Sequence, residues 1–158
     1  MAQQPVRVSY RSLPGEPQPS GEGPRLDLKV VFTDLRNTSA ALQTARAMAR
    51  GLGARITLMV AQVVPYPLPL AEPDVPPEFT GRLLESMAAK NDDDADTAVE
   101  IYLCRDRCET IRQALPPQSL VIIGARRRLW HPSWLPSWEQ RLARMLRCDG
   151  RRVLVVTV

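Results

Sequence analysis

Two apolar runs separated by a single helical segment constrain the fold of this chain more than any other feature. The first run, LDLKVVFTD at Leu26–Asp34, has a centre rich in β-branched residues, as expected of a strand buried on both faces. The second is ARITLMVAQVV at residues 54–64, and the segment between the two repeats apolar residues at helical spacing before it ends in Gly51 and Gly53. A strand, a helix and a strand within so short a stretch predict a right-handed, parallel βαβ unit.

The alternation of strand and helix patterns continues to the end of the chain. Residues 119–125 (SLVIIGA) form the purest apolar run and predict a central strand. Residues 97–104 (TAVEIYLC) alternate apolar with polar side chains, which predicts an edge strand. The stretch SWEQ, which begins at Ser137, fits a capping box and predicts the start of the last helix. In all, five predicted strands alternate with four predicted helices, the pattern of an open α/β sheet of flavodoxin-like size.

Composition separates a tail from a single domain. We predict a disordered, proline- and glycine-rich tail over residues 1–25, because this stretch has too little apolar surface to fold alone. Residues 26–158 are predicted to form one α/β domain, since 158 residues with 44% hydrophobic content suit one core. No run approaches the ~20 apolar residues of a transmembrane helix, and the N-terminus lacks the apolar stretch of a signal peptide. We therefore expect a cytoplasmic protein.

The cysteines and the histidine argue against metal binding and catalysis. Cys104 and Cys108 are four residues apart, but Cys148 lies far from them, so no fourth ligand stands at a metal-binding spacing. An odd number of cysteines fits reduced thiols better than a disulfide framework. His131 is the single histidine, and no glycine-flanked serine or cysteine–histidine pairing accompanies it. We expect neither a resident metal nor an enzyme.

The order of these elements and several sequence stretches resemble the universal stress protein (UspA-like) family over Leu26–Val158. The stretches are VVFTD, RNTSAALQTARAMARGLGARITLMV, RDRCETI, VIIGARR and the terminal VLVVTV. The resemblance implies an open, five-stranded, mainly parallel sheet of order 3-2-1-4-5 with helices on both faces. It places residues 97–104 at one edge and the C-terminal strand, residues 152–158, at the other, where two copies would pair as a homodimer.

The resemblance also implies a place for a nucleotide. Ligands of such sheets bind beyond the C-terminal ends of the strands, where the winding reverses. ATP-binding members of the family hold the adenosine with an aspartate, which corresponds to Asp34, and with backbone near Ala61. The residues themselves leave plainer roles open: Asp34 could cap the following helix, and Ala61 could be ordinary core.

The phosphate-binding loop of the family is matched only in part. Gly124 matches its first glycine, and Arg126 matches an arginine that often follows. Arg127 stands in place of the second glycine and Trp138 in place of the final hydroxyl residue, although Ser137 offers a hydroxyl one position early. Bulky side chains block the close backbone approach that glycines allow. We therefore expect a degenerate nucleotide site and no bound cofactor, while arginine side chains could still grip a phosphate.

The connection before the last helix is rich in arginine and tryptophan. Trp130, Trp134 and Trp138 recur every four residues, but the prolines between them argue against a continuous helix. We expect a compact loop with indoles folded onto the end of the sheet; the alternative is an exposed aromatic and arginine surface. The chain has a net charge of +4, and its basic end attracts anions of any kind. Without a recognisable module, we do not expect nucleic-acid binding.

Three hypotheses for function follow from these observations. The first is a non-catalytic, homodimeric UspA-like module of stress response or signalling with a degenerate nucleotide site. The second is a protein that binds an adenine nucleotide or another phospho-ligand through Asp34 and the loop Arg126–Arg128. The third is an adaptor that binds a protein or an anionic surface through the tryptophan and arginine loop, residues 126–138.

Overall fold

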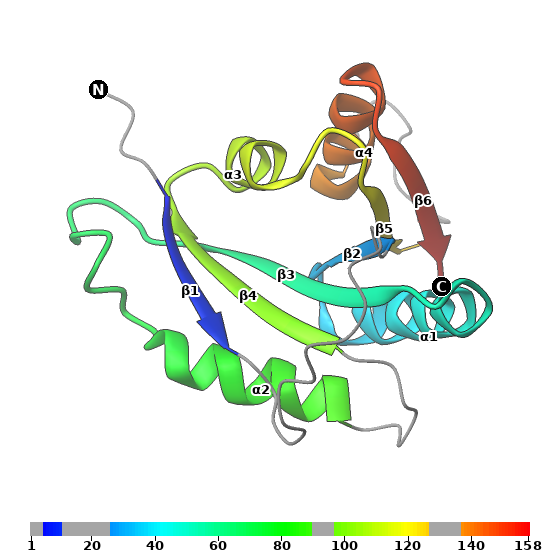
Figure 1. Ribbon diagram of the computed structural model, residues 1–158. Coiled ribbons are helices and arrows are strands. Elements are labelled where there is room, and N and C mark those ends of the chain that lie inside the picture. The colour runs from blue at the N-terminus through cyan, green and yellow to red at the C-terminus, as the bar shows by residue number, and fades with distance from the viewer. Residues whose placement is uncertain (1–4, 11–25, 90–96, 127–136) are drawn as a thin grey trace.

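The computed structural model describes residues 5–10, 26–89, 97–126 and 137–158. Within these ranges it contains a sheet flanked by helices (Figure 1). The strands are β1 (Val6–Tyr10), β2 (Asp27–Val31), β3 (Arg55–Val63), β4 (Thr97–Cys104), β5 (Leu120–Ala125) and β6 (Arg152–Thr157). The helices are α1 (Leu35–Leu52), α2 (Pro77–Ala89), α3 (Arg107–Ala114) and α4 (Trp138–Cys148).

The sheet has six strands in the order β1-β4-β3-β2-β5-β6. Strand β2 is central and pairs in parallel with both β3 and β5, while β4 and β6 extend the parallel sheet on either side. The predicted α/β class and mainly parallel sheet are confirmed. The predicted count of five strands and the order 3-2-1-4-5 were wrong, because β1 adds an antiparallel strand beside β4.

Strand β1 lies within the stretch that composition had assigned to a disordered tail. Its residues pair with β4 from Val6 opposite Leu103 to Tyr10 opposite Val99. The sequence VRVSY contains no proline and alternates valine with polar residues, so its backbone can pair along an open strand even though its surroundings are proline-rich. Residues 1–4 and 11–25 lie outside the described part of the chain, and the prediction for them stays untested.

The prediction that residues 97–104 form an edge strand was therefore wrong. The polar side chains that suggested an edge instead connect β4 to β1. Arg7 donates to Glu100 at 2.5 Å, and the Tyr102 hydroxyl donates to the other oxygen of that carboxylate at 2.9 Å. Burial and the neighbouring carboxylate raise the pKa of Tyr102 to about 12. Polar residues on a strand thus marked a place where another strand binds.

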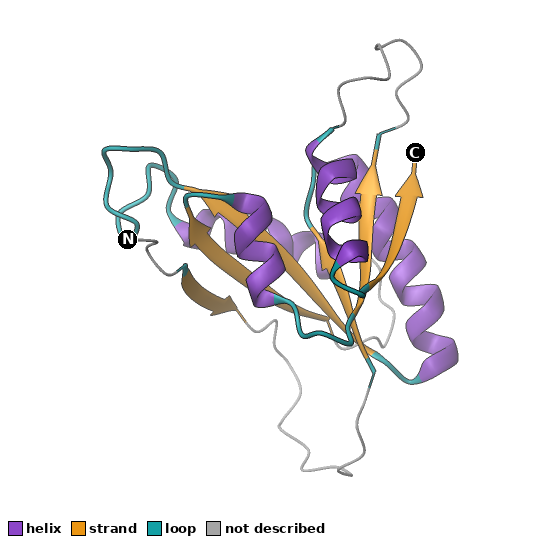
Figure 2. Ribbon diagram, turned by 90° about the horizontal axis from the view of Figure 1, so that it is seen from above, coloured by secondary structure: helices purple, strands orange, loops and turns teal. Residues whose placement is uncertain are grey.

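Each face of the sheet carries two helices (Figures 1 and 2). On one face, Leu42 of α1 and Leu84 of α2 are buried against the strands. On the other face, Ile111 of α3 and Leu142 and Leu146 of α4 fill the second part of the core. Each such side chain contributes about 2 kcal/mol through the apolar surface it removes from water. None of the helices in the described ranges is long and apolar enough to cross a membrane.

A buried arginine links the two helices on the first face. Arg46 of α1 is only 4% exposed, and its guanidinium donates to the carbonyl oxygens of Ala88 at 2.6 Å and Met87 at 3.4 Å. The last carbonyls of a helix have no partner within the helix itself. A cation there donates to them and is attracted by the negative end of the helix dipole. Arg46 thus fixes the C-terminal end of α2 against α1.

Candidate ligand-binding site

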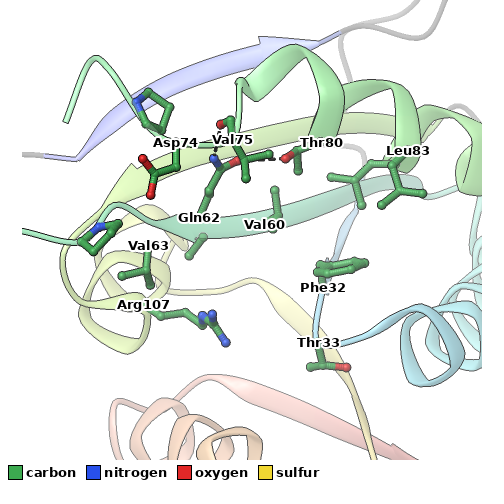
Figure 3. Close-up of a pocket in the computed structure, with 14 residues that line it drawn as sticks. Phe32, Thr33, Val60, Gln62, Val63, Asp74, Val75, Thr80, Leu83 and Arg107 are labelled. Atoms are coloured by element: carbon green, nitrogen blue, oxygen red, sulfur yellow. Dashed lines mark hydrogen bonds between the residues drawn. The ribbon is translucent and has the colours of Figure 1, made fainter. Parts of the chain in front are cut away.

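A cavity of about 420 Å³ opens at the C-terminal ends of β2 and β3 (Figure 3). This is the edge of the sheet where open α/β folds bind ligands, and the volume lies in the range of small-molecule pockets. The cavity lies between the first residue of α3 on one side and α2 on the other. The proline-rich loop that precedes α2, residues 64–76, lies on the same side as α2. Its walls are Phe32 and Thr33 after β2, residues 60–63 of β3, Pro65, Pro73, Asp74 and Val75 of the loop, Thr80, Leu83 and Leu84 of α2, and Arg107 of α3.

Most of the cavity wall is apolar. Val60, Ala61 and Leu84 are buried, and they form the part of the wall nearest the core. Val63 and Val75 are exposed by 41% and 46% and lie at its rim. Apolar side chains that are exposed beside a cavity gain from contact with an apolar ligand, because that contact removes their surface from water.

The polar side chains on the α2 side of the cavity bond to one another. Gln62 donates through its amide nitrogen to the carbonyl oxygen of Val75 at 2.6 Å, and its amide oxygen accepts from the hydroxyl of Thr80 at 2.9 Å (Figure 3). These bonds pin the loop and α2 to the end of β3. They use one donor and one acceptor position of the Gln62 amide and the donor of Thr80, which leaves fewer hydrogen-bonding positions for a polar ligand.

Arg105 holds the proline-rich loop in place from the other side. Its guanidinium donates to the carbonyl oxygens of Val64 and Leu68, each at 2.5 Å, and lies 4.0 Å from the ring centre of Tyr66. A planar guanidinium that bonds two carbonyls and stacks on a ring fixes the backbone between them. The loop wall of the cavity is therefore positioned by the chain and does not need a ligand to form it.

Arg107 is the one basic residue among the described residues of the cavity wall, and no sequence motif pointed to it. Its guanidinium lies 4.7 Å from the ring centre of Trp138, and Figure 3 shows the side chain extending toward Thr33. The neighbouring Asp106 caps α3, since its carboxylate accepts from the backbone N–H of Glu109 at 3.0 Å. A cation in the first turn of a helix opposes the helix dipole, and this unfavourable placement was the signal that could have identified Arg107.

Asp34 acts as a helix cap. One carboxylate oxygen accepts from the backbone N–H of Asn37 at 2.9 Å, and the other accepts from the side-chain amide of the same residue. The capping role left open by the sequence is confirmed. Asp34 is not among the residues that line the cavity, and both of its oxygens already have donors.

Gly124 is a glycine because helix α1 packs against it. A Cβ atom at this position would lie 2.1 Å from the backbone oxygen and 2.4 Å from the backbone carbon of Asn37. The end of β5 is further tied to the end of β2 by the Thr33 hydroxyl, which donates to the carbonyl oxygen of Gly124 at 2.9 Å. The glycine therefore has a reason in packing that is independent of any phosphate.

The start of α4 is capped by its own residues. Ser137 accepts from the backbone of Gln140 at 3.4 Å, and its own N–H donates to the side chain of Gln140 at 3.3 Å, which confirms the predicted capping box. Trp138 packs against the core on the α3 and α4 face. Arg126 is exposed, while Arg127, Trp130 and Trp134 lie outside the described residues.

Of the six residues predicted as a site, Arg127 lies outside the described residues, and the other five do not all line the cavity. Ala61 lines it, whereas Asp34 and Gly124 both contact Asn37 beside it. Arg126 and Ser137 lie at the two ends of the β5–α4 connection, whose intervening residues are not described. Across the described ranges, no group of three or more histidine, cysteine or acidic side chains is placed to hold a metal ion.

Comparison with known proteins supports the fold. The solved structure of a protein from the universal stress protein family from Burkholderia pseudomallei matches this chain with a TM-score of 0.54 at 16% sequence identity. The match covers 84% of this chain and 94% of that one. No protein-family model and no curated protein matches the sequence. The resemblance seen in the sequence is thus confirmed at the level of the fold.

Proposed function

We propose that this chain is a non-catalytic UspA-like module of stress response or signalling, located in the cytoplasm, which forms a homodimer and does not bind ATP through the family's loop. The observation that carries the proposal is the position of Asn37. Its backbone N–H and its side-chain amide each donate to one oxygen of Asp34, and its backbone oxygen leaves no room at Gly124 beyond a hydrogen atom. The cysteines of the described residues are free thiols, which agrees with a reducing compartment.

The residues present fit a triphosphate poorly. A phosphate cradle needs backbone N–H groups that a ligand can approach closely, and these come from small residues at the start of a helix. At α4 the residue after the cap is Trp138, whose ring packs on the core and on Arg107. A ribose hydroxyl would have to share the Asp34 carboxylate with the two donors of Asn37 that already bond to it.

Isothermal titration with Mg-ATP and with AMP tests the absence of a standard nucleotide site. We expect no heat of binding for either nucleotide at up to about millimolar concentration, which corresponds to less than ~4 kcal/mol of binding free energy. A dissociation constant in the micromolar range would overturn the proposal. If that binding were then lost in Arg126→Ala, the phospho-ligand hypothesis with Asp34 and Arg126–Arg128 would replace it.

The proposed dimer interface is the free side of β6. One side of this strand pairs with β5, and no other strand of the described ranges pairs with the opposite side. Leu154 and Val158 are exposed by 37% and 47%. An open strand with exposed apolar side chains is a template for pairing with a second copy.

Backbone N–H groups alternate in direction along β6. The N–H of Val158 points to β5, where it donates to the carbonyl oxygen of Ala125 at 3.3 Å. By this alternation the N–H of Val155 points to the free side of β6.

Replacing Val155 with proline should therefore convert the dimer into a monomer. Proline removes a donor from the free side of the strand and leaves the ladder to β5 intact. Val155→Thr keeps the N–H and the β-branched shape and should remain dimeric. Light scattering after gel filtration measures the outcome against the chain mass of 17.7 kDa. A monomeric wild-type protein, or a dimer that survives Val155→Pro, would contradict this interface.

A further inference from the structure

We infer that the cavity at the ends of β2 and β3 binds a small apolar monoanion, an aromatic or branched aliphatic carboxylate, with its anionic group at Arg107. The inference rests on the proposed function, because it assigns the cavity a ligand other than ATP. It names one class of occupant: a compact hydrocarbon body with a single negative charge at one end.

The walls favour a hydrocarbon body. Phe32, Val60 and Leu84 line the interior, and the exposed side chains of Val63, Val75 and Leu83 extend the apolar surface to the rim. A ligand body placed there exchanges water for contact with side chains on several sides, at about 25 cal/mol for each Å² of apolar surface removed from water. A cavity of about 420 Å³ is large enough for a one- or two-ring ligand.

The pairing of the polar groups disfavours a polar body such as a sugar or a nucleobase. Gln62 and Thr80 are bonded to each other and to the loop, and the Thr33 hydroxyl donates to Gly124. Backbone donors at the strand ends are also used, since the N–H groups of Phe32 and Val64 donate to Met59 and Cys104. A ligand with many donors and acceptors would replace only part of the hydrogen bonds that it makes with water.

Among the described residues of the wall, Arg107 supplies the charge-assisted bond to the anion and sets the orientation of the ligand. Its guanidinium is held over the ring of Trp138, so less side-chain freedom is lost when it binds an anion. Among the described residues of the wall, the other charged one is Asp74, which is exposed on the loop. Figure 3 shows Asp74 and Arg107 on opposite sides of β3. A carboxylate therefore binds at the Arg107 side, away from the repulsion of Asp74.

Isothermal titration of the full chain with 2-naphthoate, and with the neutral 2-naphthamide of the same shape, tests this assignment. We expect 2-naphthoate to bind with micromolar affinity and about tenfold more tightly than 2-naphthamide, because only the acid forms a charge-assisted bond. Arg107→Gln should reduce the affinity for 2-naphthoate about tenfold and leave 2-naphthamide unchanged. Arg126→Gln is the matched control, since Arg126 is an exposed arginine outside the cavity wall, and it should alter neither affinity.

Failure of this inference can be told apart from failure of the proposed function. Absence of 2-naphthoate binding at millimolar concentration, equal affinities for acid and amide, or full affinity in Arg107→Gln would each overturn the inference. The comparison of acid with amide needs no variant, so it decides the question even if Arg107→Gln does not fold. Micromolar binding of Mg-ATP alongside an Arg107-dependent 2-naphthoate site would overturn the proposed function alone.

Discussion

Replacing Gly124 with alanine should lower the free energy of unfolding by about 3 kcal/mol, at the upper end of the usual cost of overpacking a core. The added methyl group would lie 2.1 Å from the backbone oxygen of Asn37. That contact involves backbone in the first turn of α1 and cannot be relieved by rotating a side chain. Either β5 or the start of α1 must move, and the hydrogen bond from Thr33 to Gly124 would be strained with it. Urea unfolding followed by circular dichroism measures the loss.

Gly51→Ala is the control for the general effect of removing a glycine. Nothing lies within 4 Å of a Cβ atom at Gly51, which is in helix α1. Alanine there should raise the stability by about 0.5 kcal/mol through helix propensity. If Gly124→Ala and Gly51→Ala changed the stability by similar amounts, the packing explanation for Gly124 would be wrong, and a role in ligand binding would regain weight.

Replacing Arg46 with methionine should cost about 2–3 kcal/mol, because it leaves buried backbone groups without their partner. Methionine keeps much of the apolar length of the side chain but cannot donate to Ala88 and Met87. The freed C-terminal end of α2 should then open more often, and amide hydrogen exchange in α2 should rise above that in α1. The same change should also loosen the α2 wall of the cavity, because Thr80, Leu83 and Leu84 belong to α2.

Arg36→Met provides the comparison for Arg46. Arg36 lies on the same helix but is exposed and sits in the first turn, where a cation opposes the helix dipole. Its replacement should change the free energy of unfolding by no more than about 0.5 kcal/mol. An effect of Arg46→Met below this level would show that the carbonyls of Ala88 and Met87 find other partners at little cost.

The sequence was most informative where local pattern and burial agree. The strand at Asp27–Val31, the helix that follows and the strand at Arg55–Val63 carry apolar residues on the faces that the fold buries, so their type and order could be predicted. β1 could not be predicted in this way. Its pairing depends on an open partner strand, and an alternation of only five residues within a proline-rich stretch is too short to predict a strand by itself.

The candidate site was harder to predict because it depends on contacts between residues that are far apart in the sequence. A carboxylate before a helix suits a cap and a ligand equally well, and only the bonds from Asn37 identify Asp34 as a cap. The pairing of Gln62 with Thr80 joins residues 18 positions apart, and the contact of Arg107 with Trp138 joins two helices. No motif encodes such pairs. Residues that approach each other only in the folded chain define this cavity.

Strand β1 has a consequence for how copies of this molecule can associate. It covers the outer side of β4, where the ion pair between Arg7 and Glu100 holds it, so the border of the sheet on this side is β1 itself. The two outer strands of the described sheet differ in direction, because β1 runs antiparallel to β4 while β6 runs parallel to β5. If two molecules pair through β6 about a twofold axis, as proposed above, each keeps a short outer strand of five residues, β1, facing away from the pair.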